Sequence, residues 1–117
     1  MMEQTDAVAA LSALAHPGRL AVFRLLVKAG AGGLPAGEIA RGTQSLPNTL
    51  STNLGILVHA GLIHARRDGR QVIYTADYPA MSQLLTFLME DCCQGEPAIC
   101  APLADIARGA GCGAGAC

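Results

Sequence analysis

The sequence predicts a mainly α (α+β) fold, in which four helices precede a β-hairpin and one helix follows it. The 117 residues are 51% hydrophobic but only 3% aromatic and contain no Trp, a composition that suits closely packed Ala- and Leu-rich helices. Apolar residues recur at helical spacing along most of the chain. The pair Asp68-Gly69 lies between two short predicted strands and indicates a hairpin. A chain of this length is expected to form one domain with its own core.

The first two helices are predicted at residues 4–15 and 17–29, on either side of the break His16-Pro17-Gly18. The first helix has an apolar face made of Ala7, Val8, Leu11 and Leu14. The second has an apolar face made of Leu20, Phe23, Leu25 and Leu26.

The three histidines, His16, His59 and His64, are far apart in the sequence and lack the spacing of metal ligands.

A short third helix at about 35–42 and a fourth at about 46–60 are joined by a turn at 42–45. Ser45 is the predicted N-cap of the fourth helix, and Pro47 lies in its first turn, where a missing N–H costs nothing. The buried stripe of this helix is expected to be Leu50, Leu54 and Leu57. Gly61 is expected to end the helix.

Two strands at about 62–66 and 71–75 and a last helix at about 79–91 complete the domain. The apolar face of the last helix is Met81, Leu84, Leu85, Leu88 and Met89. The order α-α-α-α-β-β-α is that of a winged helix-turn-helix, with the first and last helices available as a dimer interface. We therefore expect residues 1–91 to form a DNA-binding and dimerisation domain, and residues 92–117 to form a glycine-rich, cysteine-containing sensing segment.

The charge distribution indicates a polyanionic partner for the middle of the chain. Residues 17–76 carry a net charge of +5, between −2 for residues 1–16 and −4 for residues 77–117. The fourth helix would insert in the major groove, and the polar residues predicted to contact bases and phosphates are Asn48, Thr49, Ser51, Thr52 and Asn53. The predicted wing residues that contact phosphate or enter the minor groove are Arg66, Arg67 and Arg70.

All five cysteines lie in the last 26 residues, which favours metal binding or redox chemistry over a disulfide framework. Cys92, Cys93 and Cys100 can supply three thiolates to one soft ion such as As(III) or Sb(III). Tetrahedral Zn(II) would need a fourth ligand from Cys112, Cys117 or another subunit. The chain has no apolar run of 18 residues and no secretory signal pattern at its start, so we expect a cytoplasmic protein.

Three motifs resemble the ArsR/SmtB metalloregulatory repressors, and together they cover about residues 5–90. They are Ala15-His16-Pro17-x-Arg19-Leu20, Leu50-Ser51-x-Asn53-Leu54-x-x-Leu57-x-x-Ala60-Gly61-Leu62 and Arg67-x-Gly69-Arg70-x-x-x-Tyr74. The resemblance implies a homodimeric repressor that leaves its operator DNA when an inducer binds. The cluster Cys92, Cys93 and Cys100 is similar to that of arsenic-responsive members with thiols at the end of the last helix.

The chain departs from this family in three ways. It has no cysteine next to the fourth helix, where other arsenic-responsive members have a cluster. Its last helix has no His, which zinc-sensing members use as a ligand. Both absences move the expected sensing to the C-terminal thiols. The family also often has His where Thr52 or Asn53 stands, which leaves the base contacts open.

The leading hypothesis is therefore a repressor that senses trivalent arsenic or antimony, with no organic cofactor and no membrane partner. A sensor of Zn, Cd, Pb or thiol oxidation that uses the same cysteines is the alternative. A small dithiol redox enzyme is disfavoured, because the chain has no Cys-x-x-Cys and no acid–base groups around its thiols. We expect no enzymatic activity.

Overall fold

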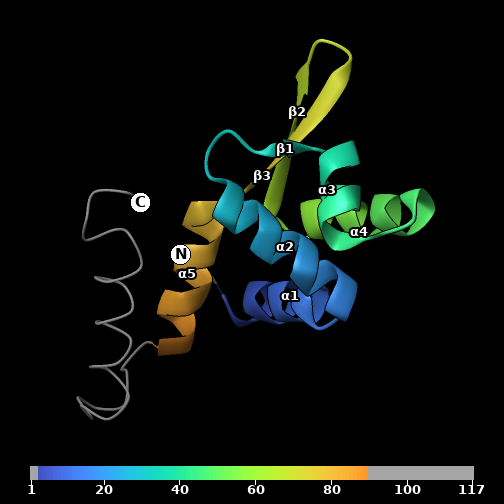
Figure 1. The fold of residues 1–117 in the computed structure, drawn as a ribbon. Helices are drawn as coiled ribbons and strands as arrows, with labels where there is room; N and C mark the ends of the chain where they lie inside the picture. Colours follow the sequence, from blue (N-terminus) through green and yellow to red (C-terminus); the bar gives the residue numbers. More distant parts are fainter. Residues whose placement is uncertain (1–2, 90–117) are drawn as a thin grey trace. The chain divides into compact units, whose positions relative to one another are not determined.

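The computed structural model describes residues 3–89. The chain divides within its last described helix into two units, Met1–Leu84 and Leu85–Cys117. The elements are α1 (Gln4–Leu14), α2 (Pro17–Ala29), β1 (Leu34–Pro35), α3 (Ala36–Thr43), α4 (Pro47–His59), β2 (Ile63–Asp68), β3 (Gln71–Ala76) and α5 (Tyr78–Met89) (Figure 1). The predicted winged helix-turn-helix is confirmed, with the strand β1 in addition.

The core forms around α4. Its predicted stripe is confirmed, because Leu50, Leu54 and Leu57 are all buried. The large side chains that surround this stripe come from α2, α3 and the start of β2; they are Val22, Phe23, Leu26, Ile39, Leu62 and Ile63. Burying a side chain of this size is worth about 1.5–3 kcal/mol, so the stripe fixes α4 against the rest of the domain.

The buried face of α1 differs from the predicted one. Its buried residues are Ala7, Ala10 and Ala13, whereas Val8 is 57% exposed and Leu11 42% exposed. The helix contacts both α2 and α4, and alanine side chains allow helix axes to approach closely. The larger apolar side chains of α1 are consequently left outside the core of the single chain.

The sheet has three antiparallel strands in the order β1-β3-β2. Strand β1 was not predicted, because two residues carry no readable periodicity; Leu34 pairs with Tyr74 and Pro35 with Ile73. Asp68 pairs with Gln71, so the hairpin loop is Gly69-Arg70, one residue later than predicted. Gly69 has φ +65°, the conformation that the first loop residue of a type II′ turn requires.

Helix α5 begins at Tyr78, and Leu84 is its buried residue. Of its predicted apolar face, Leu85 and Leu88 are exposed in the single chain. Within residues 3–89, no single helix is long and apolar enough to cross a membrane. The helices α1 and α2 would reach the required length and composition only as a pair, and they are bent by 102° at their break.

Candidate DNA interface

The turn between α3 and α4 is held by backbone and hydroxyl hydrogen bonds. Gln44 adopts a left-handed conformation, with φ 54°, and the Ser45 N–H donates to the Ala40 carbonyl at 3.0 Å. The Thr43 hydroxyl donates to the Ile39 carbonyl at 2.7 Å and lies 2.6 Å from the Ser45 hydroxyl. The prediction of Ser45 as the N-cap is wrong: Leu46 occupies that position without a side-chain cap, because the Ser45 hydroxyl bonds within the turn.

One face of α4 is both exposed and uncharged. It carries four of the five predicted reading residues, Asn48, Thr49, Ser51 and Thr52. The Thr52 hydroxyl donates to the Asn48 carbonyl at 3.1 Å. Because its hydrogen is used within the helix, the Thr52 side chain can contact a ligand only through its methyl group and the lone pairs of its oxygen. Gly55 lies on the same helix, is exposed, and has open space where a Cβ would stand.

Asn53 is not on this face, and its prediction as a non-core residue is wrong. It is 4% exposed, and the position of a Cβ on Gly18, at the start of α2, would lie 2.9 Å from its Nδ2 atom. Within residues 3–89, this Nδ2 is the buried side-chain nitrogen without a hydrogen-bond partner. Leu50, Asn53, Leu54 and Leu57 follow the i, i+3, i+4, i+7 spacing of one helix face. That spacing is a sequence signal that Asn53 belongs to the buried stripe.

The three wing arginines lie in different environments. Arg66 donates from its Nη2 to the Gly32 carbonyl, in the loop before β1, at 3.2 Å. Arg67 is its neighbour on β2 and therefore projects from the opposite face of the ribbon. Arg70 is in the hairpin loop. All three are exposed. Arg66 differs from the other two because its side chain already bonds the Gly32 carbonyl.

The space beside α3 has two hollow parts, one of 520 Å³ between β3 and α3 and one of 220 Å³ between α3 and α4. Both parts are lined by Ala36, Gly37 and Tyr74. Glu38, on the rim of the first part, lies 3.9 Å from Arg41 across an exposed pair, which is worth little energetically.

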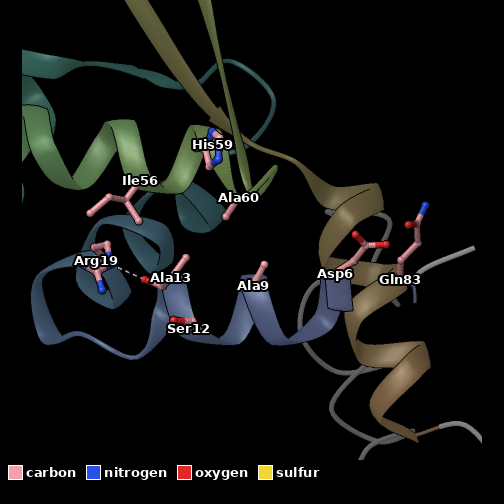
Figure 2. A pocket seen from close by; sticks show the side chains of 9 residues that line it. All are labelled: Asp6, Ala9, Ser12, Ala13, Arg19, Ile56, His59, Ala60 and Gln83. Carbon is pink, nitrogen blue, oxygen red and sulfur yellow. Dashed lines mark hydrogen bonds between the residues drawn. The ribbon is translucent and has the colours of Figure 1, made fainter. Parts of the chain in front are cut away.

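A separate groove of about 570 Å³ lies between α1 and α4 (Figure 2). Small residues of α1 form its floor, with Arg19 towards one end and Asp6 towards the other. The Nε of Arg19 donates to the Ala13 carbonyl, which fixes the side chain at that end. The groove therefore presents opposite charges at its two ends.

The predicted thiolate site of Cys92, Cys93 and Cys100 lies outside the described residues. Over residues 3–89, no group of three or more His, Cys, Asp or Glu side chains is placed to hold a metal ion.

Sequence reasoning missed a side-chain contact between β2 and the residue that precedes α5. His64 Nε2 lies 2.7 Å from Asp77 Oδ2. The Asp77 Oδ1 accepts a hydrogen bond from the Ala80 N–H at 2.9 Å, as an N-cap does. An Asp directly before a helical apolar pattern was the available signal, but the helix had been predicted to begin at Pro79.

Comparisons with known proteins agree with this fold. A family model described as a helix-turn-helix domain matches residues 14–66. The chain is 38% identical to the uncharacterized HTH-type transcriptional regulator Rv0081 of Mycobacterium tuberculosis over 73 residues, which are 62% of this chain and 61% of that protein. It is 31% identical to the HTH-type transcriptional regulator YgaV of Escherichia coli over 88 residues, which are 75% of this chain and 87% of that protein. The chain thus spans less than two thirds of the mycobacterial relative.

Solved structures give the same result. The transcriptional repressor BigR from Xylella fastidiosa matches with a TM-score of 0.59 and 28% identity, over 72% of this chain and 86% of that one. The homodimeric winged helix-turn-helix domain of Mb0332 from Mycobacterium bovis, a possible ArsR-family regulator, matches with a TM-score of 0.61 and 27% identity, over 72% of this chain and 76% of that one. A possible transcriptional regulator for arsenical resistance matches with a TM-score of 0.59 and 28% identity, over 68% of this chain and 79% of that one.

Proposed function

Because this chain belongs to the helix-turn-helix family of transcriptional regulators, we propose that it is a homodimeric ArsR-type repressor that binds operator DNA and releases it when trivalent arsenic or antimony binds Cys92, Cys93 and Cys100. The observation that carries the DNA-binding part is the exposed, uncharged polar face of α4, which follows the turn after α3 and precedes a hairpin with three exposed arginines. BigR, of similar structure, is a transcriptional repressor.

The chemistry of the α4 face favours reading of A·T base pairs. Asn48 can bond adenine at N6 and N7, and the methyl groups of Thr49 and Thr52 can contact the thymine methyl. The described face has no Arg or Lys for guanine and no carboxylate for cytosine. Positive charge for the phosphates comes from the wing and from the other helices instead.

Gly55 gives a test of how closely α4 approaches DNA. Gly55→Ala is expected to stabilise the fold by about 1 kcal/mol, because alanine is the better helix former and its Cβ meets nothing. The same variant is expected to bind operator DNA several-fold more weakly, because the methyl group holds α4 away from the bases. Urea unfolding and fluorescence anisotropy measure the two effects. Gly55→Leu should weaken binding further, and equal affinities across this series would show that Gly55 faces away from DNA.

The exposed apolar residues of α1 support dimerisation. Val8 and Leu11 are large apolar side chains without cover in the single chain. A two-fold dimer brings each surface against its own copy, so this apolar face of α1 can be buried against the same face of a partner. Mb0332, of similar structure, is homodimeric. Two linked recognition helices can then bind two half-sites.

The proposed inducer rests on the sulfur content of the C-terminal segment. Residues 3–89 contain no cysteine, so thiol chemistry can act on this domain only from residue 92 onward. Three thiolates are the ligand set that soft trivalent ions prefer. A possible arsenical-resistance regulator is among the similar structures. Coupling between such a site and DNA is typically about 1–3 kcal/mol, or about 5- to 150-fold in affinity.

Arsenite titration of the protein–DNA complex tests this assignment. We expect arsenite to lower operator affinity at least about tenfold, and Cys92→Ser, Cys93→Ser and Cys100→Ser combined to abolish the response without changing affinity in its absence. The matched control is Cys112→Ser with Cys117→Ser, which should respond as the natural chain does. Release of DNA from the triple variant by arsenite would show that the site lies elsewhere.

The alternative inducers would act on the same thiols, and the same assay distinguishes them. A sensor of Zn, Cd or Pb would release DNA with one of these ions but not with arsenite. A sensor of thiol oxidation would release DNA with an oxidant and bind it again after addition of a reductant. Mass spectrometry of the complex then counts the bound ions per dimer.

A further inference from the structure

We propose that the contact between His64 and Asp77 couples the position of α5 to that of β2, and so determines how the wing lies on DNA. This inference rests on the proposed DNA-binding function, and it assigns a positioning role to two residues that make no DNA contact. The pair connects strand β2, which carries Arg66 and Arg67, to the residue that caps α5.

Asp77 is bonded on several sides. Its Oδ2 accepts from His64 Nε2 at 2.7 Å, and its Oδ1 accepts from the Ala80 N–H at 2.9 Å. Its own N–H donates to the Leu62 carbonyl at 2.8 Å, and its carbonyl accepts from the Met81 N–H at 3.0 Å. The Asp77 side chain is only 17% exposed, whereas that of His64 is 65% exposed. The carboxylate is thus fixed by the start of α5, and His64 contacts it from the more exposed side.

The start of α5 is also anchored to the rest of the domain. The Tyr78 hydroxyl donates to the Val27 carbonyl of α2 at 3.1 Å. A displacement of this first turn would therefore be resisted by α2 on one side and passed to β2 through His64 on the other. At its far end, α5 leads along the chain towards the cysteines.

The wing receives this constraint on one face. His64 and Arg66 are two residues apart on β2 and share a face of the ribbon. Arg66 in turn bonds the Gly32 carbonyl. The same face of β2 is therefore held at two successive positions, by α5 at His64 and by the α2–β1 loop at Arg66. The opposite face, with Arg67, is left to meet DNA.

The test compares operator affinity and its salt dependence in four variants of the full chain. His64→Leu removes the donor, and His64→Gln retains an N–H that can reach the carboxylate. Asp77→Asn keeps the helix cap but removes the negative charge. The fourth variant combines His64→Leu with Asp77→Asn. Thermal unfolding of each variant checks that the fold is kept.

We expect His64→Leu and Asp77→Asn each to weaken binding about 3- to 10-fold, with an unchanged slope of log Kd against log salt. The double variant should bind DNA about as well as the single variant with the lower affinity, because both substitutions break the same contact. His64→Gln should bind with the affinity of the unsubstituted protein. A smaller slope would make His64 a phosphate ligand and overturn the proposal. An unchanged DNA affinity in His64→Leu would also overturn it, as would losses of affinity that add up in the double variant. A natural chain that binds no DNA would instead overturn the proposed function itself.

Discussion

Gly33→Ala is expected to lower the free energy of unfolding by about 4 kcal/mol or more, enough to unfold many small domains. Gly33 has φ +68°, a conformation that costs other residues about 1–3 kcal/mol. A Cβ there would also overlap the Tyr74 carbonyl oxygen, and it would lie 2.9 Å from the Ile73 Cγ2. The carbonyl belongs to the central strand β3, which is paired on both sides, so it cannot move away without breaking the sheet.

Gly32→Ala is the matched control for this prediction. It adds the same methyl group one residue earlier, where nothing lies within 4 Å of the new Cβ. Urea or thermal unfolding followed by circular dichroism measures both variants. A free energy of unfolding for Gly33→Ala within about 1 kcal/mol of that of the unsubstituted protein would show that the entry into β1 tolerates a side chain despite these contacts.

Arg67→Ala combined with Arg70→Ala is expected to weaken DNA binding about a hundredfold or more near 0.15 M salt. In the proposed dimer the change removes four charges from two wings. Each phosphate contact contributes about 0.9 to the slope of log K against log salt, so the slope should fall by about 3 to 4. The loss should be similar for operator and unrelated DNA, because phosphate contacts carry no sequence information.

The matched control removes the same charge from another exposed place. Arg24→Ala with Lys28→Ala takes two positive charges from α2 and none from the wing. A filter-binding or anisotropy titration across several salt concentrations should give a smaller change of slope for this control. An equal change in both double variants would mean that overall charge, and not the wing, sets the salt dependence. Arg66→Ala alone should have less effect, because Arg66 already bonds Gly32.

The sequence was most informative where periodicity and chemistry agreed. In α4, Leu50, Leu54 and Leu57 were identified from their spacing, and all three are buried. Asn53 lies on the same stripe, but its polarity suggested exposure. Its burial depends on Gly18, which is distant in the sequence and makes room for it. No local pattern shows that contact, so polarity was the misleading signal.

Other differences have similar physical causes. The buried face of α1 consists of alanines because neighbouring helices approach closely there, and helix proximity is not visible in a single sequence. The hairpin loop is shifted by one residue because pairing of Asp68 with Gln71 extends the ladder to the last possible position. The His64–Asp77 pair joins residues 13 positions apart, and only the folded register of β2 and β3 places them together.

The proposed DNA-reading face of α4 can change without loss of the fold. Asn48, Thr49, Ser51 and Thr52 are exposed, and the one side-chain hydrogen bond among them stays within the helix. Substitutions at exposed positions of this kind usually change stability by no more than about 0.5 kcal/mol. Duplicated copies of the gene could therefore drift towards new operators through these four positions, while selection for a folded protein acts on Leu50, Leu54 and Leu57 from the other side of the same helix.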